Sequence, residues 1–404
     1  MHKLIFILFL FFAPMVMSQE NLDEQYVDSV TYQYYINGAW NDVIGLGKKA
    51  LKQGLNFKYL QQRMGYAYFQ KSDYHEAIRY YEKALDFDPL DEVSLLYLHY
   101  SGLNIADHDF ARHYAGKLSK DRQEQIGEKS FRPVNAVDFE YCYKWHSEAT
   151  RSNPNYQRIG LNTQLGYSAN LYQAISSYNQ SATYTDEFND YRSAIKQNEY
   201  YMLLSGYINA NIGIDLGYHY ANAKYHTEVW DLTLNEMTEQ IDTLKFPTHL
   251  LYGGIHYKWY RFNLKLSESF LHTASNNTFQ TGIHLGFALP GNHNIYIRNS
   301  VYFLKDNDDQ WKVSQHSIGL LLLKKFWLEG EQSFGKLTNF ADKNGMYIYN
   351  SFDSSLSKSS LSLFWYANKH FILFSNFSLE KKQQDILLNY YQQKSISGGI
   401  IWKL

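Results

Sequence analysis

The sequence has a single cysteine, Cys142, among its 404 residues. One thiol can form no internal disulfide and cannot build a cysteine-based metal site, so the fold is stapled by neither, and Cys142 is an ordinary strand residue. After residue 17 no apolar run approaches the roughly 18 residues that a membrane-spanning helix needs, and the mean hydropathy is -0.45. These absences exclude a disulfide scaffold and a helical membrane protein.

The chain also lacks an excess of charge and the common catalytic motifs. A net charge of -2 provides no basic face for nucleic acid. The sequence contains no G-x-S-x-G elbow, H-E-x-x-H helix, P-loop, Rossmann glycine run or paired C-x-x-C. We therefore expect a protein that is not an enzyme, needs no cofactor or metal ion, and does not bind nucleic acid.

Aromatic residues, in contrast, are abundant. They make up 17% of the chain, with 37 tyrosines and 25 phenylalanines. Outer-membrane β-barrels carry girdles of aromatic side chains at both lipid–water interfaces, so this composition suits such a barrel. An aromatic-rich soluble β-protein is the alternative.

Residues 1–18 have the pattern of a secretory signal peptide. His2 and Lys3 precede an apolar core from Leu4 to Ala13, and no cysteine follows as a lipoprotein signal would require. We expect cleavage before Gln19 and export of the remaining chain.

Residues 136–404 alternate apolar and polar side chains in runs of about ten to fifteen residues. In the clearest run, Ile212, Ile214 and Leu216 share one parity, while Gly213 and Asp215 share the other. A β-strand places the two parities on opposite faces. A soluble antiparallel sandwich would alternate in the same way, so the connections between the runs must decide.

The connections alternate between short turns and longer polar loops. The long connections are 181–193, 226–246, 337–355 and 382–393. Short turns on one rim and long loops on the other are typical of outer-membrane barrels, whose short rim is periplasmic. We count about fourteen strands, with both ends of the barrel on the periplasmic rim. The predicted strands are 136–147, 155–166, 168–180, 196–208, 211–225, 247–258, 260–272, 277–288, 292–304, 311–323, 325–336, 356–367, 370–381 and 394–404.

Residues 19–125 show a helical period and a repeat of 34 residues, the length of a tetratricopeptide unit. The best copy runs from residue 58 to residue 91, and degraded copies flank it. We predict three repeats, followed by a linker at 126–135, because residues 121–135 are polar and unpatterned. The signature positions of the middle copy are occupied by Gly65, Tyr68, Ala77, Tyr81, Ala84 and Pro89.

Tyr32, Tyr66 and Tyr100 are one repeat apart, at a first-helix position that faces the concave groove in tetratricopeptide domains. Tyr35 and Phe69 each lie three residues after one of these tyrosines. Aromatic faces bind peptides and sugar rings with little loss of entropy, so we predict a binding groove for a periplasmic protein or polymer. Packing against the next repeat or the barrel rim is the alternative.

Charged and histidine side chains fall on the lumen parity of the strands. Their charges have both signs, so the lumen is not plainly selective for anions or cations. A barrel of fourteen strands can be either filled or open, and the sequence does not decide which. His219, His256 and His284 could also belong to a lumen metal site or a serine–histidine hydrolase. The alternative is that they are simply polar residues that face water in the lumen. The predicted lumen set is Asp215, His219, Lys258, Arg261, Lys265, His284, Arg298, Glu329 and Glu331.

The chain resembles two groups of exported proteins with tetratricopeptide repeats and a barrel: the YaiO-type barrel family and the exopolysaccharide exporters. The expected fold class is α+β, an N-terminal helical solenoid followed by an antiparallel transmembrane β-barrel. The resemblance implies an outer-membrane location, with the repeats in the periplasm. The first hypothesis for function is recruitment of a partner for transport or export across the outer membrane. The alternatives are a non-conducting anchor for the repeats and an outer-membrane hydrolase.

Overall fold

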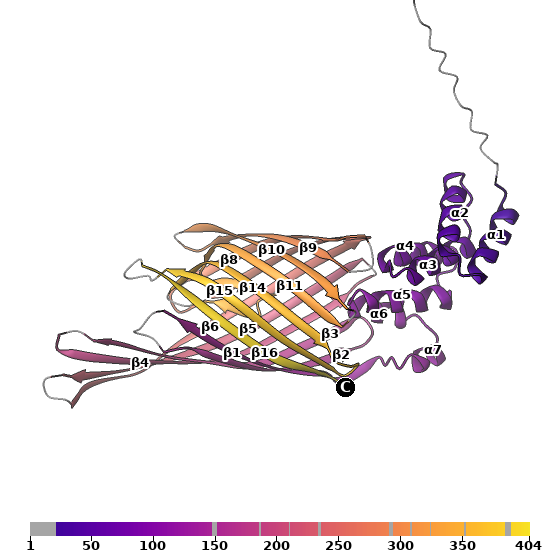
Figure 1. Cartoon of the computed structure of the whole chain (residues 1–404). Helices are drawn as coiled ribbons and strands as arrows, with labels where there is room; N and C mark the ends of the chain where they lie inside the picture. Colours follow the sequence, from indigo (N-terminus) through magenta and orange to yellow (C-terminus); the bar gives the residue numbers. More distant parts are fainter. Residues whose placement is uncertain are drawn as a thin grey trace, which may run out of the picture.

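The structure is a computed structural model, and it describes residues 22–147, 152–185, 187–209, 211–232, 236–290, 294–307, 309–323, 325–350, 353–383 and 389–404. The predicted signal peptide lies outside the described residues. Helices form the N-terminal part and antiparallel strands the C-terminal part, which confirms the predicted fold class (Figure 1). The helices are α1 (Glu24–Ile36), α2 (Trp40–Lys52), α3 (Lys58–Gln70), α4 (Tyr74–Leu85), α5 (Glu92–Asn104), α6 (His108–Ala115) and α7 (Lys120–Gln125).

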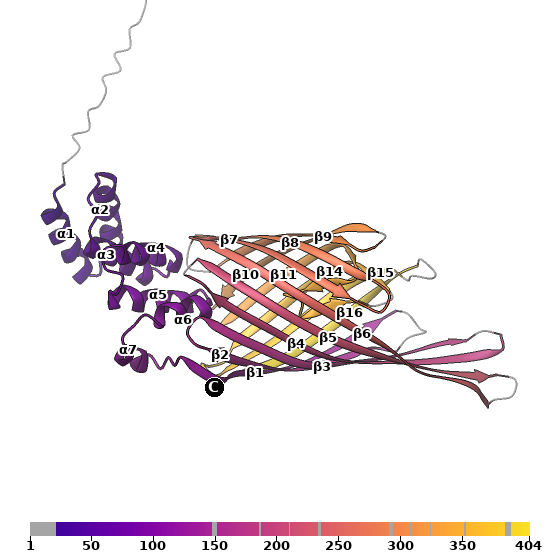
Figure 2. The same ribbon diagram turned by 180° about the vertical axis from the view of Figure 1, so that it is seen from behind.

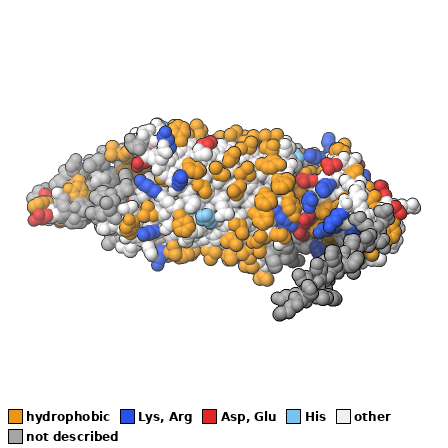
Figure 3. All heavy atoms as spheres, turned by 90° about the horizontal axis from the view of Figure 1, so that it is seen from above, with side chains coloured by type: hydrophobic (Ala, Val, Ile, Leu, Met, Phe, Trp, Pro, Cys, Tyr) orange, Lys and Arg blue, Asp and Glu red, His pale blue; other side chains and the backbone are white. Residues whose placement is uncertain are grey.

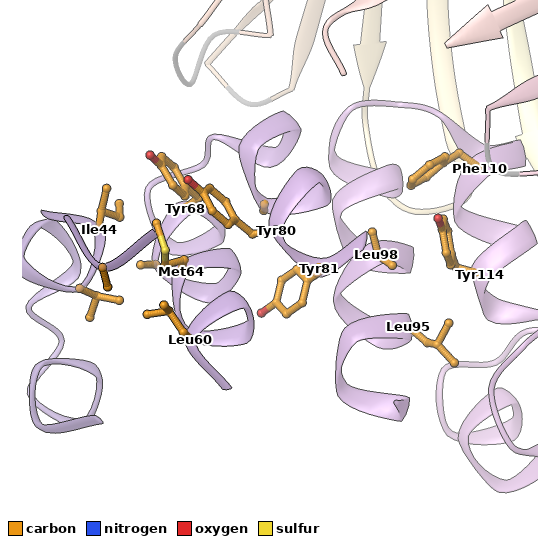
Figure 4. Close-up of a cluster of buried hydrophobic side chains, with 14 of the residues drawn as sticks. Ile44, Leu60, Met64, Tyr68, Tyr80, Tyr81, Leu95, Leu98, Phe110 and Tyr114 are labelled. Carbon is orange, nitrogen blue, oxygen red and sulfur yellow. The ribbon is translucent and has the colours of Figure 1, made fainter. Parts of the chain in front are cut away.

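Helices α1 to α6 form three helix pairs, which we call the helical domain. Small residues let the two helices of a pair approach: a side chain at Gly65 would meet the ring of Tyr81 at 2.9 Å. Aspartate caps the second helix of the middle and last pairs, since Asp73 accepts from the backbone N–H of Glu76 and Asp107 accepts from that of Phe110. The core between the pairs is apolar and aromatic (Figure 4).

Fourteen strands form one closed barrel, as predicted. Each strand pairs with its neighbours in sequence, and β1 pairs with β16 to close the cylinder, with Ala136 opposite Lys403. The barrel strands are β1 (Phe131–His146), β2 (Asn155–Leu165), β3 (Ala169–Thr185), β4 (Asn189–Tyr207), β5 (Ile212–Asp231), β6 (Glu236–Trp259), β7 (Phe262–His272), β8 (Asn277–Ala288), β9 (Tyr296–Lys305), β10 (Gln310–Leu322), β11 (Phe326–Leu337), β14 (Ser354–Tyr366), β15 (Phe371–Gln383) and β16 (Tyr390–Lys403).

The helical domain lies at the short-turn end of the barrel, beside the C-terminus (Figures 1 and 2). Strands β3 to β6 run past the other strands at the opposite end, where the two long hairpins project. The predicted long connections at 181–193 and 226–246 are therefore wrong in large part. Pairing continues through them, as between Gln180 and Ile195, because alternating tyrosine, tryptophan and valine residues there still suit a sheet.

Two further predictions need correction near residue 130. Strand β1 begins at Phe131, inside the predicted linker, and a register shift separates Arg132 from Ala136. Pro133 lies within that shift, where a missing backbone N–H interrupts no regular pair. The segment that we predicted to be unpatterned also contains α7.

The connection from β11 to β14 was predicted as a loop, but it contains a small hairpin of β12 (Phe340–Asp342) and β13 (Tyr347–Tyr349). Its tip turns through three consecutive residues with positive φ, Lys343, Asn344 and Gly345. A side chain at Gly345 would meet Leu250 at 2.5 Å, so the tip fits closely against β6. We call residues 338–350 the inner hairpin segment.

An apolar band runs all the way round the outer surface of the barrel. Every barrel strand contributes at least one large apolar side chain that is exposed, for example Ile175 at 61% and Leu264 at 39%. Figure 3 shows these side chains covering the middle of the barrel on one face. Aromatic pairs border the short-turn rim, including Phe371 with Trp402 at 6.2 Å between ring centroids. Among the described helices, none is both long and apolar enough to cross a bilayer.

Candidate functional site

Four of the five groove residues belong to one continuous group of rings. Tyr66 contacts Tyr35 at 5.1 Å and Trp40 at 5.4 Å, and it contacts Tyr97 at 5.3 Å between centroids. Tyr97 joins Phe69 at 5.2 Å and Tyr100 at 6.3 Å. These rings are partly exposed, and they link α1, α2, α3 and α5. We call them the aromatic cluster: Tyr35, Trp40, Tyr66, Phe69, Tyr97 and Tyr100.

Tyr32 does not join this cluster through a ring contact, although it occupies the equivalent repeat position. Its ring is 49% exposed and lies over the guanidinium of Arg63 at 5.3 Å. Arg63 also donates to a carboxylate oxygen of Asp28 at 2.8 Å. Sequence spacing alone therefore groups residues whose surroundings differ.

Sequence reasoning missed two members of the cluster, Trp40 and Tyr97. Trp40 begins α2 and is one repeat before Tyr74, which begins α4, so the 34-residue spacing could have identified it. Tyr97 has no aromatic equivalent one repeat earlier, where the sequence has Arg63. Burial, followed by the neighbouring Tyr66 and Tyr35, raises the pKa of Tyr97 to about 12. Its hydroxyl therefore stays protonated and can donate a hydrogen bond at neutral pH.

Lys258 and Arg261, predicted to line the lumen, lie at the short-turn rim and bind the helical domain. Arg261 donates to Asp73 at 2.6 Å and is almost fully buried. Lys258 forms an ion pair with Asp107 and also contacts the hydroxyl of Tyr207. The two aspartates are the caps of α4 and α6, so equivalent positions of two repeats each receive one barrel cation.

Other polar contacts extend this interface across the rim. Tyr260 donates to Glu76 at 2.7 Å, and Tyr167 donates to Gln123 at 2.7 Å. His75 lies half-buried beside them, and burial together with the nearby Arg261 lowers its pKa to about 4. The helical domain is therefore docked on the barrel by charged and polar groups, and Tyr207 of β4 also packs into the core of the helical domain.

The inner hairpin segment lies inside the barrel and is hydrogen-bonded to its wall. His219 of β5 contacts the carbonyl of Gly345 at 2.8 Å, and Tyr201 of β4 donates to the carbonyl of Asn344 at 3.0 Å. Lys265 of β7 donates to the side chain of Asn344 at 3.0 Å. On the opposite wall, Tyr347 donates to Glu140 of β1 at 2.9 Å. The tip is thus held from several sides of the lumen.

Apolar and amide contacts fix the stem of the hairpin. The ring of Phe340 is fully buried and meets Tyr302 of β9 edge-on at 4.9 Å. Gln280 of β8 makes two bonds to the backbone of Ala341, at 2.9 and 3.0 Å. Leu250 and Leu271 pack on Ala341 as a second small core. The lumen is therefore occupied by packed side chains at this level.

The remaining charged residues of the predicted lumen set have partners within the wall or lie near the rim. Asp215 forms an ion pair with Lys265. Glu329 accepts a hydrogen bond from Tyr296, and Arg298 lies over the same ring at 5.2 Å. Glu331 shares the lumen-facing side of β11 with Glu329. Sequence reasoning missed the buried Arg158, which bonds to Asp138 at 3.3 Å and to Glu140 at 3.0 Å.

The lumen histidines lie apart from one another and contact different residues. His284 lies between two hydroxyls, Ser267 at 3.0 Å and Ser300 at 2.9 Å. His219 contacts Glu199 at 3.4 Å as well as the hairpin. A serine–histidine pair is thus present, but its imidazole meets a second hydroxyl where a hydrolase would place a carboxylate. Within the described ranges no group of three or more His, Cys, Asp or Glu side chains could hold a metal ion.

Comparison with known proteins identifies one of the two parts by sequence. The tetratricopeptide repeat family model matches residues 60–90. No curated protein matches the chain.

Solved structures resemble the barrel at low identity. The Ralstonia pickettii toluene transporter TbuX is 5% identical with a TM-score of 0.48, covering 68% of this chain and 90% of its own. A bacterial polysaccharide outer membrane secretin is 7% identical with a TM-score of 0.40, covering 67% and 99%. The KdgM porin is 9% identical with a TM-score of 0.33, covering 66% and 99%. At these scores, none of the functions in those names follows for this chain.

Proposed function

We propose that this protein is an outer-membrane anchor: a closed barrel that holds a periplasmic tetratricopeptide domain, which in turn recruits a partner. The apolar band supports insertion into a bilayer, because every barrel strand exposes apolar side chains where a soluble barrel would expose polar ones. The helical domain shares the short-turn end with the C-terminus, and that end is periplasmic in barrels of this kind.

The inner hairpin segment is the observation that favours an anchor over a channel. Its contacts reach strands on several sides of the lumen, including Glu140, His219, Lys265 and Gln280. An open channel would instead leave these polar groups to water. The first hypothesis, transport or export, would require the segment to leave the lumen and expose the apolar contacts of Phe340.

Conductance in a planar bilayer tests the closed barrel directly. We expect no conductance from the mature protein or from a variant that lacks residues 19–130. Replacement of residues 340–349 by a short glycine–serine linker should produce steady conductance. Heat-modifiable migration on a gel would verify that each barrel is folded. Steady conductance of the mature protein would contradict the anchor and favour transport.

The aromatic cluster is the proposed recruiting surface of the helical domain. Rings from several helices present a partly exposed, rigid surface, and tyrosine hydroxyls at its edge can hydrogen-bond. Such a surface fits an extended peptide segment of a periplasmic protein, with a sugar polymer as the second candidate.

A displayed peptide library selected on the mature protein provides the probe for this surface. The double substitution Y66A/Y100A should weaken binding of the selected peptides about thirtyfold or more, since truncating an aromatic anchor costs about 1 kcal/mol or more in interfaces. Y32A is the matched control, because Tyr32 makes no ring contact with the cluster among the described residues. Loss of the helical circular dichroism signal in Y66A/Y100A would instead assign these tyrosines to packing.

No catalytic step is proposed for the contact between Ser267 and His284. The hydrolase alternative predicts ester hydrolysis that H284Q abolishes without unfolding the barrel. Retention of that activity in H284Q, or no activity above background in the wild type, would leave the contact as a hydrogen bond of the wall.

A further inference from the structure

A row of three lysines crosses the outer face of the barrel near the long-loop end. Lys196 of β4 is directly opposite Lys224 of β5, and Lys224 is directly opposite Lys245 of β6. All three side chains are exposed. Lys224 has the strand parity of the exposed Leu216, whereas the buried His219 has the other parity. The row therefore points away from the lumen.

The arrangement is electrostatically unfavourable without a counter-charge. Directly opposite side chains of antiparallel strands have Cβ atoms about 4.5–5.5 Å apart, and like charges there repel. None of the three lysines forms an ion pair or hydrogen bond with any other residue in the described part of the chain. Farther out on the same face, Arg192 and Asp190 pair at 2.9 Å, so nearby cations do have acidic partners.

The row lies where the headgroups of a bilayer would be. Lys224 is about 12 residues beyond the start of β5, which places it roughly 30 Å along the barrel axis at usual strand rise and tilt. Between it and the apolar band lies a band of rings, with Tyr220 opposite both Tyr200 and His249.

We infer that the lysine row binds a lipid of the outer leaflet whose phosphorylated headgroup has a net negative charge. This inference rests on the proposed insertion into the outer membrane. Adjacent ammonium groups attract a phosphate whose negative charge is not balanced by a cation of the same headgroup. The acyl chains of the same lipid would lie over Leu216 and Leu251, which are 55% and 57% exposed below the row. A free phosphate ion could use the charges but not this apolar surface.

Native mass spectrometry of the mature protein in neutral detergent micelles tests the site. The probes are dioleoyl phosphatidic acid, dioleoyl phosphatidylcholine and inorganic phosphate. We expect retention of phosphatidic acid, and about a tenfold loss of that binding in K196Q/K224Q/K245Q. The matched control is K394Q, because Lys394 is an exposed lysine opposite Leu379 and Trp145 rather than another lysine.

Three results would overturn the inference. The triple variant could bind phosphatidic acid like the wild type, phosphatidylcholine could be retained equally well, or inorganic phosphate at equal concentration could displace the lipid and so identify a free-anion site. Flotation with lipid vesicles separates this test from the proposed function. A protein that does not float contradicts membrane insertion and the lipid site together, whereas a floating protein with unaltered binding in the triple variant contradicts the lipid site alone.

Discussion

The helical domain and the barrel place their apolar side chains in opposite directions. In the helical domain Leu60, Met64 and Leu98 are fully buried, and the core contains few charges. In the barrel, Arg158 and Glu140 are buried in the interior, while Leu264 and Ile283 are exposed on the outside. The same chain is therefore built for two solvents. Under the proposed function, water surrounds the helical domain and lipid surrounds the barrel.

The largest loss of stability is expected from a charged residue in the core of the helical domain. Leu98→Asp should unfold the helical domain, at a cost of more than about 4 kcal/mol, because an unpaired carboxylate would be buried. The matched control Leu103→Asp, on the same helix at 38% exposure, should change stability by less than about 0.5 kcal/mol. Circular dichroism at 222 nm reports the helices and gel heat-modifiability reports the barrel, which should stay folded.

A charged residue on the outer face of the barrel should destabilise the protein only where lipid surrounds the barrel. Ile283→Lys places an ammonium in the apolar band and should cost about 2–4 kcal/mol in a bilayer. Ile283→Ala controls for lost packing, and both should be measured by urea unfolding in lipid vesicles. Equal stability of the lysine and alanine variants would mean that position 283 does not face lipid.

The junction of the two parts should respond to charge more moderately. Asp73→Asn with Asp107→Asn keeps both helix caps, because asparagine caps as well as aspartate, but removes the ion pairs to Arg261 and Lys258. We expect docking to weaken by about 1–3 kcal/mol. Hydrogen exchange in α4 and α6 should accelerate. Asp23→Asn, at a cap with no barrel contact, should leave exchange unchanged.

The smallest expected effect is that of pH on docking of the helical domain. The pKa of His75 is about 4 when docked, below the ordinary value of about 6.5 for an exposed histidine, so docking disfavours the charged form. Docking should therefore be strongest above pH 6.5 and weaken as the pH falls toward 4, by about twentyfold between pH 7 and 5. Hydrogen exchange at the two pH values measures this, and His75→Gln should remove much of the difference.

The alternation of apolar and polar residues and the 34-residue repeat predicted the architecture, because both patterns depend on residues that are close together in the sequence. Period 2 identified all fourteen barrel strands, since each must separate a lumen face from an outer face. The signature residues Gly65 and Tyr81 identified the middle repeat because a small residue must lie against a ring there. These constraints act on neighbouring residues and can be read from one sequence.

The inner hairpin segment and the docked rim were not predictable in the same way. Residues 338–350 contain several polar residues and a glycine, so the sequence predicts a loop, and only contacts with distant strands place them inside the lumen. Lys258 and Arg261 have the parity of lumen residues, yet their partners lie more than a hundred residues earlier in the chain. Long-range pairing of this kind leaves no periodic signal.

Closure between β1 and β16 also fixes an order of events during assembly. The pair Ala136 and Lys403 joins the two ends of the barrel sequence, so this contact order is nearly the maximum that the barrel allows. The helical domain packs each helix mainly on its sequence neighbours and can fold much sooner. Its two capping aspartates would then already be in place when the last strand arrives. The helical domain, which folds first, would thus present a docking surface to the rim of the barrel, which closes last.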